Sequence, residues 1–356
     1  MRLFVTGGAG FIGSHYVRSL LQGAYPGYEE AEVTVFDKLT YAGNLANLAP
    51  VADNPRYRFV QGDICDPVAL EAALPGHDAV VNFAAETHVD RSITGAADFA
   101  MTNFVGAQQV FDAALRHRVG RVVQVSTDEV YGTIPDGSWR EDHLLEPNSP
   151  YSAAKAGADL LARAYARTYG LPISVTRCSN NYGPYQFPEK VIPLFVTNLL
   201  DGRPVPLYGD GGNVRDWLHV ADHCRGIQLV LEKGRSGEIY HIGGGTELTN
   251  RELTGRLLDA CGAGWDMVRP VTDRKGHDRR YSLDISKISA ELGYAPQVGL
   301  SDGYARQEVD LDLPLLIENL HCPNELVVRP DRAIAKTGQR SGNRPAAFRG
   351  RQYFHP

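Results

Sequence analysis

The sequence predicts an α/β protein, with a Rossmann-type doubly wound parallel sheet and a smaller mixed α/β lobe. Short β-branched and apolar runs alternate with stretches of helical spacing, which is typical of βαβ units. A glycine-rich turn follows the first apolar run directly. After Pro184, proline and glycine become more frequent and the apolar runs become shorter, which indicates a second lobe.

Six apolar runs are expected to form the strands of the sheet, at residues 3–5, 33–36, 57–60, 79–83, 121–125 and 173–176. Two long stretches between them, residues 98–118 and 150–169, repeat Ala, Leu and Phe at spacings of three and four and so predict helices. In the second lobe we expect helical pieces near residues 194–200, 220–231 and 250–261.

This pattern divides the chain into three parts. Residues 1–180 form the sheet domain, and residues 181–300 form the lobe, with some of its segments returning to the first domain. Residues 301–356 are rich in Arg, Gly, Pro and Ala, a composition that buries little core, and we expect a flexible basic tail.

Composition and charge exclude several classes of protein. With 43% hydrophobic and 22% charged residues, the chain is not disordered throughout, and a net charge of −6 gives no overall reason to expect a nucleic-acid or membrane partner. The five cysteines are scattered without a Cys-x-x-Cys pair, so we expect reduced thiols and no metal site. The glycine turn begins within six residues of Met1 and leaves no room for a signal peptide, which predicts a cytoplasmic protein.

The glycine-rich turn predicts a dinucleotide site. Gly7, Gly10 and Gly13 allow a tight turn, a close approach of the backbone to a pyrophosphate, and close packing of the following helix. Asp37 ends the second strand about twenty residues further on, where a carboxylate accepts hydrogen bonds from ribose hydroxyls and favours NAD over NADP. A purely structural turn remains the alternative for the glycines. Asp63 follows the third strand, where it is either an adenine contact or an ordinary turn aspartate.

Two further motifs predict acid–base chemistry. Tyr151 and Lys155 are four residues apart on one helix face, so a cation can lie beside the phenol and lower its pKa. The preceding strand ends in Thr127, Asp128 and Glu129, and two neighbouring carboxyl groups can act as acid and base. The alternatives are a chance surface pair for the first motif and a polar loop or helix cap for the second.

Together these motifs resemble the extended short-chain dehydrogenase/reductase superfamily. The segments at residues 84–92, 126–132, 180–186 and 273–281 narrow the resemblance to the dTDP-glucose 4,6-dehydratase family, from residue 1 to about residue 300. Two features depart from that family. Lys275 stands where the family commonly has proline, and the Trp-rich helix that usually ends the family's chains has no counterpart after Trp265.

The resemblance implies roles for five residues in a net dehydration, which makes the enzyme a lyase. Tyr151 would take the proton of the sugar C4 hydroxyl while NAD accepts hydride from C4, and Lys155 would tune the phenol and bind the nicotinamide ribose. Glu129 would then remove the C5 proton, Asp128 would protonate the departing C6 hydroxyl, and Thr127 would hydrogen-bond the C4 oxygen. Return of hydride to C6 would give a 4-keto-6-deoxy sugar nucleotide.

The resemblance also implies two sets of binding residues. The NAD-binding residues are Gly7, Gly10, Phe11, Ile12, Gly13, Asp37, Lys38, Leu39, Thr40, Asp63, Ile64, Phe83, Ala84, Ala85, Thr102, Ser126, Tyr151, Lys155 and Asn181. The residues that bind dTDP-glucose are Thr87, Thr127, Asn180, Glu189, Lys190, Val191, Pro206, Leu207, Tyr208, Arg215, Asn250, Asp273, Arg274, His277 and Tyr281. For Arg215, a solvated or ion-paired arginine is the alternative from the sequence alone.

Two alternatives to a dehydratase stay open at this stage. The first is another NAD-retaining sugar-nucleotide enzyme, a 4-epimerase or a UDP-glucuronate decarboxylase, which has no need of the acid and base after Thr127. The second is a non-catalytic NAD-binding module. The family resemblance further implies a homodimer through the helices at residues 98–118 and 150–169.

Overall fold

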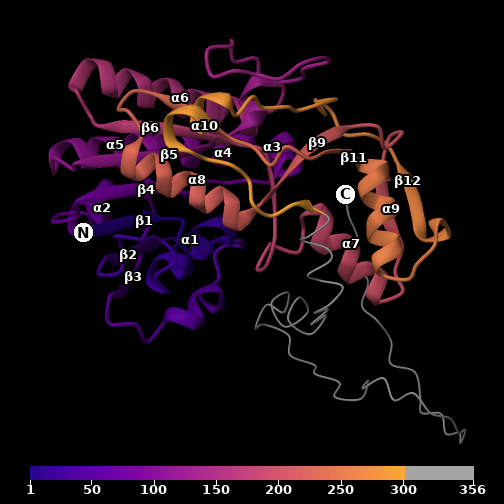
Figure 1. Cartoon of the computed structure of the whole chain (residues 1–356), viewed down its shortest axis with the longest axis horizontal. Coiled ribbons are helices and arrows are strands. Elements are labelled where there is room, and N and C mark those ends of the chain that lie inside the picture. The colour runs from indigo at the N-terminus through magenta and orange to yellow at the C-terminus, as the bar shows by residue number, and fades with distance from the viewer. Residues whose placement is uncertain (301–356) are drawn as a thin grey trace, which may run out of the picture. The chain divides into compact units, whose positions relative to one another are not determined.

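The first 300 residues, which the computed structural model describes, are organised around one seven-stranded sheet (Figure 1). The strand order is β10-β6-β5-β4-β1-β2-β3, and every neighbouring pair is parallel. The strands are β1 (Arg2–Thr6), β2 (Glu32–Asp37), β3 (Tyr57–Gln61), β4 (Ala79–Asn82), β5 (Arg121–Thr127), β6 (Ile173–Cys178) and β10 (Ile239–Ile242). The predicted doubly wound parallel sheet is confirmed.

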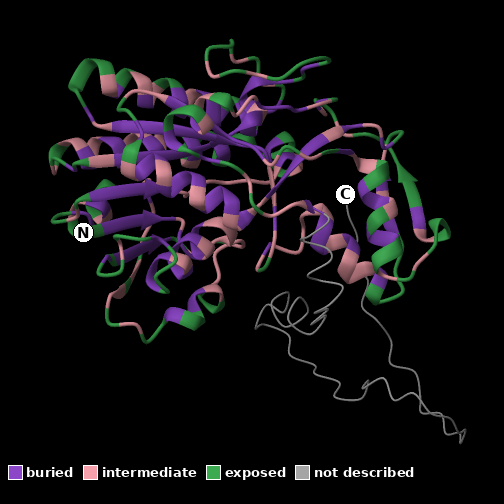
Figure 2. Ribbon diagram, in the orientation of Figure 1, coloured by how far each residue is buried: buried purple, intermediate pink, exposed green. Residues whose placement is uncertain are grey.

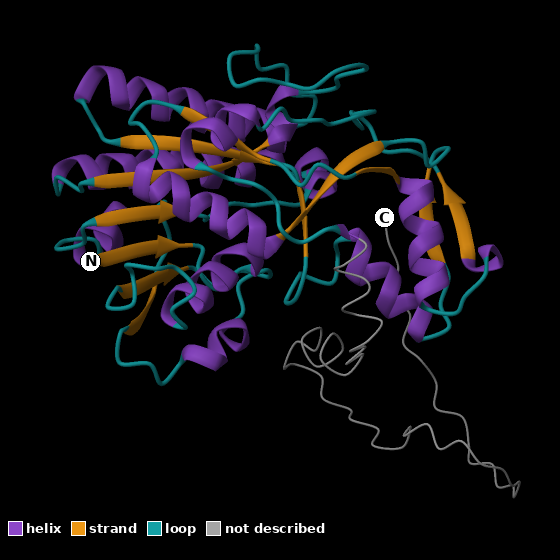
Figure 3. Cartoon of the chain, in the orientation of Figure 1, coloured by secondary structure: helices purple, strands orange, loops and turns teal. Residues whose placement is uncertain are grey.

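Helices cover both faces of this sheet (Figure 3). One face packs against α1 (Phe11–Leu21) and α8 (Val220–Lys233), around a core that contains Leu3 and Val5. The other packs against α2 (Pro67–Ala73), α5 (Ala107–Arg116) and α6 (Pro150–Tyr169), around a core that contains Phe4 and Val80. Burial on both faces explains why the strands read as continuous apolar runs rather than alternating ones (Figure 2).

The smaller lobe contains two short sheets and two helices. Its three-stranded sheet has the order β11-β9-β7, from Glu247–Thr249, Val214–His219 and Asn180–Tyr182, and β8 (Val205–Tyr208) pairs in parallel with β12 (Val268–Val271). Helices α7 (Val191–Leu200) and α9 (Asn250–Ala260) pack against each other around a separate apolar core. A capping box between Thr249 and Glu252 fixes the start of α9.

The remaining elements are short. Two α-helices, α3 (Val89–Thr94) and α4 (Ala96–Phe99), lead into the π-helix η2 (Ala100–Gly106), and α10 (Ser286–Leu292) packs near β10. The 3₁₀ helices are η1 (Leu45–Val51), η3 (Asp128–Tyr131) and η4 (Trp265–Met267).

Two expectations about helices differ from the structure, and β10 adds a seventh strand to the six that the sequence predicts. The helix predicted at residues 98–118 is not one regular α-helix, because α4 passes through the π-helix η2 before α5 begins. The helix expected in the lobe near residues 220–231 is α8, which packs on the large sheet and is one of the segments after residue 180 that return to the first domain. The reason is topological: β10 follows α8 and joins the sheet beside β6, so α8 is the connection between two sheet strands.

Three observations bear on the expectations about the chain as a whole. Within residues 1–300, no helix combines the length and the apolar character needed to cross a membrane. The four cysteines in that range, Cys65, Cys178, Cys224 and Cys261, are free thiols. The tail predicted at residues 301–356 lies outside the described residues.

Candidate active site

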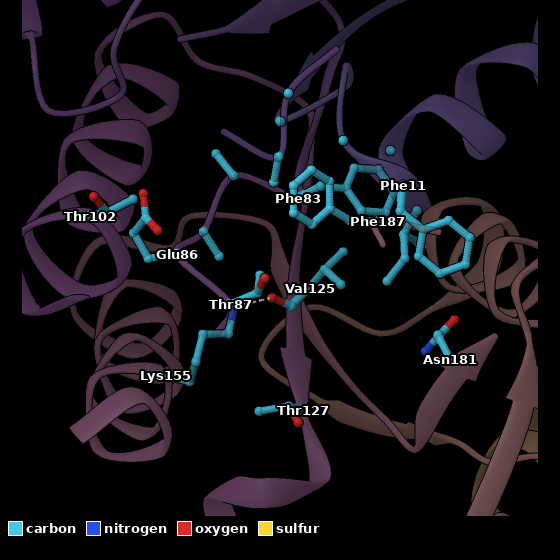
Figure 4. Close-up of a pocket in the computed structure, with 18 of the residues that line it drawn as sticks. Phe11, Phe83, Glu86, Thr87, Thr102, Val125, Thr127, Lys155, Asn181 and Phe187 are labelled. Carbon is cyan, nitrogen blue, oxygen red and sulfur yellow. Dashed lines mark hydrogen bonds between the residues drawn. The ribbon is translucent and has the colours of Figure 1, made fainter. Parts of the chain in front are cut away.

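A cavity of about 300 Å³ lies at the carboxyl ends of the sheet strands (Figure 4). Its walls come from the turns after β1, β2, β3, β4, β5 and β6, and from the segment at residues 186–190. The strand order changes direction between β1 and β4: β2 and β3 lie on one side of β1, and β4, β5 and β6 lie on the other. Open α/β sheets bind ligands at such a switch point.

The glycine turn after β1 forms one end of the cavity. Gly7 has a φ of +66°, and a Cβ there would lie 2.5 Å from the backbone nitrogen of Ala84. A Cβ at Gly13 would lie 2.4 Å from the Gly7 oxygen. Both positions therefore require glycine. Helix α1 begins directly after Gly10, which provides no side-chain cap, so the helix start keeps backbone N–H groups for an anion.

The carboxylate at the end of β2 lies next to this turn. Asp37 accepts hydrogen bonds from the backbone nitrogens of Ala9 (2.9 Å) and Leu39 (2.8 Å), and burial raises its pKa. Nearby, the ammonium group of Lys38 contacts the Asp63 carboxylate at 2.6 Å. An anion-binding helix start beside an acidic strand end is the donor and acceptor set that a dinucleotide requires, so the cavity fits NAD.

Asp128 and Glu129 follow β5 directly and lie in the 3₁₀ helix η3. Thr127 caps this helix: its hydroxyl accepts from the Glu129 nitrogen at 3.3 Å and donates to Asp128 Oδ1 at 3.2 Å. Asp128 Oδ2 is buried and has no hydrogen-bond partner among the described residues. It is therefore a polar atom directed at a ligand rather than at the protein.

The two carboxyl groups differ in their electrostatic surroundings. Burial, and next the neighbouring Glu129, raise the pKa of Asp128 well above its usual value. Burial also raises the pKa of Glu129, but Arg274, Arg215 and Lys190 oppose that shift. The pair is thus arranged so that Asp128 keeps its proton while Glu129 ionises more readily.

Tyr151 and Lys155 lie on the first turns of α6, next to these carboxyl groups. Ser149 caps the helix and Pro150 follows it, so α6 begins where the sequence predicts. Lys155 Nζ donates to the Val125 carbonyl oxygen at 2.6 Å (Figure 4). Both side chains are buried.

The pKa of Tyr151 runs against one sequence-based expectation. Burial, and next Glu129, raise it well above its usual value in the protein alone, whereas the sequence predicts that Lys155, helped by the positive nicotinamide, lowers it. The ammonium group of Lys155 is engaged with a backbone carbonyl, and burial lowers its own pKa. A further positive charge beside Tyr151 in the cavity would lower the pKa of the phenol.

The cavity wall contains most of the residues predicted to bind NAD and some of those predicted to bind the sugar nucleotide. Leu39 is the one predicted NAD residue that does not line it; its side chain instead packs against the apolar core beneath α1. Four of the predicted sugar-nucleotide residues line the cavity: Thr87, Thr127, Asn180 and Lys190. The structure therefore gathers the residues around the sheet edge into one site.

The other predicted sugar-nucleotide residues lie in or beside the lobe, outside the cavity wall. They are Glu189, Val191, Pro206, Leu207, Tyr208, Arg215, Asn250, Asp273, Arg274, His277 and Tyr281. Arg215 is buried, stacks with its guanidinium carbon 4.1 Å from the centre of the Tyr281 ring, and donates to the Asp278 backbone carbonyl oxygen at 2.9 Å. It forms no ion pair with a carboxylate among the described residues, which excludes the solvated or ion-paired alternative.

Several wall residues were missed by sequence reasoning. Gly43 lines the cavity, and a Cβ there would lie 2.8 Å from Asp37 Oδ1. Phe187 lies in the wall and packs edge-on against Tyr41, at 5.6 Å between ring centres. The others are Phe36, Ala42, Gly62, Glu86, Val125, Cys178, Ser179 and Gln186. Most follow a strand end by one to five residues, and that position is the signal that could have found them.

Comparisons with known proteins agree with this geometry. The family described as GDP-mannose 4,6 dehydratase matches residues 4–307. A dTDP-glucose 4,6-dehydratase of Streptomyces niveus is 63% identical over 303 residues, which cover 85% of this chain and 90% of the relative.

Two solved structures show how far the likeness extends. The crystal structure of DesIV, a dTDP-glucose 4,6-dehydratase from Streptomyces venezuelae with NAD and TYD bound, is 65% identical, with a TM-score of 0.85 over 88% of this chain and 100% of that one. A UDP-glucose 4-epimerase of Thermus thermophilus in complex with NAD is 32% identical, with a TM-score of 0.77 over 85% and 96%. The chain belongs to the GDP-mannose 4,6 dehydratase family, among its dTDP-glucose 4,6-dehydratases.

Proposed function

We propose that this chain is an NAD-dependent hydro-lyase that converts dTDP-glucose to dTDP-4-keto-6-deoxyglucose and water. The observation that carries the proposal is the position of the buried Asp128 and the half-buried Glu129, two carboxyl groups with different surroundings, in the same cavity wall as Tyr151 and Lys155. The identity of 63–65% to two dTDP-glucose 4,6-dehydratases supports the same substrate.

The glycine turn, Asp37 and Lys155 would hold NAD. When bound, NAD supplies a hydride acceptor for the sugar C4 and a hydride donor for C6. Tyr151 takes the proton of the C4 hydroxyl, and Thr127 orients the C4 oxygen with its own hydroxyl. Burial of the Asp37, Thr127, Tyr151 and Lys155 side chains excludes water and so strengthens each of their interactions.

The elimination step belongs to η3. Once C4 is a ketone, the C5 hydrogen is acidic, and the Glu129 carboxylate removes it. Burial and Glu129 raise the pKa of Asp128, which favours the protonated acid that can donate its proton to the departing C6 hydroxyl. The C6 oxygen leaves as water. With the hydride that bound NAD would return to C6, Glu129 gives its proton back to C5. The proton that Tyr151 took from the C4 hydroxyl replaces the one that Asp128 lost.

The same two carboxyl groups separate this function from its alternatives. A 4-epimerase or a UDP-glucuronate decarboxylase also begins with oxidation at C4, but neither expels a C6 hydroxyl. A non-catalytic NAD-binding module needs none of the five side chains Thr127, Asp128, Glu129, Tyr151 and Lys155, and yet all five line one cavity.

We infer that the sugar nucleotide spans from the cavity to the lobe. The cations Arg215 and Arg274 and the aromatic ring of Tyr208 come from the lobe, where they suit a diphosphate and a base. Arg274 also reaches the sheet domain, with its guanidinium 3.8 Å from the Asp90 carboxylate. Replacement of Arg215 by Met is expected to raise KM for dTDP-glucose more than it lowers kcat, which steady-state kinetics would measure.

We infer that the chain forms a homodimer through η2 and α6. Met101 and Phe104 of η2 and Leu160 of α6 are exposed large apolar side chains, and Ala153 and Ala164 continue an exposed apolar row along α6. Such a row on two adjacent helices is typical of a helix-bundle interface. We also infer a cytoplasmic location, which the free thiols of the described cysteines support.

A further inference from the structure

Four buried polar side chains lie behind the cavity and form one connected network. Asp159 comes from α6, Arg177 from β6, Tyr131 from the end of η3 and His241 from β10. Each has a relative exposure of 1% or less. None of the four lines the cavity.

Arg177 is the centre of this network. Its Nε donates to Asp159 Oδ2 at 2.9 Å, and its Nη1 donates to the Tyr131 hydroxyl oxygen. The guanidinium carbon also lies 4.7 Å from the centre of the Tyr131 ring. One side chain therefore holds a carboxylate on α6 and a phenol on η3 at the same time.

The Tyr131 hydroxyl is fixed from its other side by His241. Burial, and next Arg177, lower the pKa of His241 to about 3, so the imidazole is neutral. Its Nδ1 lies 3.0 Å from the Asp284 backbone oxygen and must donate to it, which leaves Nε2 to accept from the Tyr131 hydroxyl at 2.7 Å. Every hydrogen bond from Arg177 through Tyr131 and His241 to the Asp284 oxygen thus has one possible donor and one possible acceptor.

The ends of the network lie next to the two halves of the catalytic machinery. Tyr131 is in the same 3₁₀ helix as Asp128 and Glu129. Asp159 is one helical turn after Lys155 and two turns after Tyr151 on the same face of α6. Its carboxylate also opposes the lowering of the Lys155 pKa by burial.

A buried ion pair is weak evidence for stability, because desolvation of both charges offsets most of their attraction. Geometry is the better explanation here. We propose that Arg177 is a positioning residue, which through Tyr131 and Asp159 holds the acid–base turn that carries Asp128 and Glu129 at a fixed place relative to the Tyr151–Lys155 helix.

The proposal, which rests on the proposed function, separates two steps of the reaction. Oxidation at C4 depends on Tyr151 and Lys155, whose helix stays in place without the Tyr131 hydroxyl. Elimination depends on Asp128 and Glu129, whose turn then loses its anchor. Weakening the anchor should therefore slow removal of the C5 proton more than oxidation at C4.

Tyr131→Phe is the sharpest test, because it removes one hydroxyl and leaves the Arg177–Asp159 pair intact. We expect kcat to fall about tenfold or more, with KM within about twofold of wild type. With substrate deuterated at C5, the isotope effect on kcat should rise, and the absorbance of reduced nicotinamide should build up in the steady state. Neither signal would follow from reduced stability alone.

Tyr240→Phe is the matched control. Tyr240 is equally buried, precedes His241 in β10, and its hydroxyl also makes two hydrogen bonds, with Glu291 Oε2 and the Arg235 nitrogen, both at 3.0 Å. We expect this variant to keep the wild-type isotope effect. Equal isotope effects and kcat values in the two variants, together with a wild-type isotope effect in the double variant described next, would overturn the positioning role.

A second variant covers the case in which Tyr131→Phe changes little because Arg177 still contacts the ring. The double substitution Arg177→Met with Asp159→Leu removes both buried charges together and so avoids leaving one unpaired. We expect the same rise in the C5 isotope effect; a folded double variant with the wild-type isotope effect would overturn the proposal. If wild-type protein fails to convert dTDP-glucose, the proposed function falls and takes this inference with it.

Discussion

Asp128 and Glu129 are neighbours in the chain, but their carboxyl groups meet different surroundings. Asp128 is buried with one oxygen lacking a hydrogen-bond partner among the described residues, whereas three cations act on Glu129. The sequence predicts this pair because two acids follow a strand end in a sheet domain. It could not predict which acid keeps its proton, since that depends on Arg274, Arg215 and Lys190, which come from distant parts of the chain.

Glu129→Gln should separate oxidation from dehydration. Gln has nearly the same shape but cannot accept the C5 proton, so we expect C4 oxidation to continue and kcat for dehydration to fall by about 10² to 10⁴. Rapid mixing with dTDP-glucose would show reduced nicotinamide that forms and persists. A variant that produces the 4-keto-6-deoxy sugar at the wild-type rate would exclude Glu129 as the base.

Asp128→Asn should make the protein less active but more stable at higher pH. The pKa of Asp128 is raised in the folded state above its usual 3.8. At a pH between 3.8 and the pKa of the folded state, the folded chain holds a proton that the unfolded chain releases. Stability is therefore lost as pH rises through that window. Asparagine does not titrate, so the variant lacks this loss of stability. Its gain in Tm over wild type should therefore grow with pH in thermal melts taken at steps of about one pH unit from pH 4 to pH 8. A constant difference would contradict the raised pKa.

At the scale of elements, some helices and turns are determined by local sequence and others by tertiary contacts. The glycine turn and the whole of α6 could be predicted, because glycine spacing, a Ser-Pro start and a glycine end are local signals. The π-helix η2 and the placement of α8 could not. Asn103 of η2 makes two hydrogen bonds with the Glu86 backbone. Helix α8 packs on the large sheet because β10, which comes after it, pairs with β6. Both features depend on residues that are distant in the sequence.

Gly13→Ala should release NAD. The added Cβ would lie 2.4 Å from the Gly7 oxygen and force the turn and α1 apart, at a cost of about 1–3 kcal/mol in stability. We expect purified protein to carry less NAD than wild type, as measured by extraction and absorbance.

Gly255→Ala provides the control for a new methyl group. Gly255 lies inside α9, where a Cβ would be 3.5 Å from the Trp265 ring, and Ala in a helix interior should add about 0.5–1 kcal/mol. Equal NAD content in the two variants would show that the glycine turn does not hold the cofactor.

At the scale of the whole molecule, the proposed dimer buries the exposed apolar row on η2 and α6. Leu160→Glu places a charge in the middle of that row, so we expect a dimer mass for wild type and a monomer mass for the variant by light scattering at micromolar concentration. Leu144→Glu is the control, because Leu144 is exposed but lies in the loop before α6. A monomeric wild type would reject the dimer.

The central claim is that one cavity performs oxidation, dehydration and reduction on dTDP-glucose with NAD that stays bound. The most direct measurement is to incubate purified protein with dTDP-glucose, without added NAD, and to determine the mass of the sugar nucleotide together with its absorbance in alkali. We predict the loss of one water and the absorbance of a 4-keto-6-deoxy sugar. An unchanged mass with formation of the galactose isomer would indicate an epimerase, and no conversion even with added NAD would contradict the account.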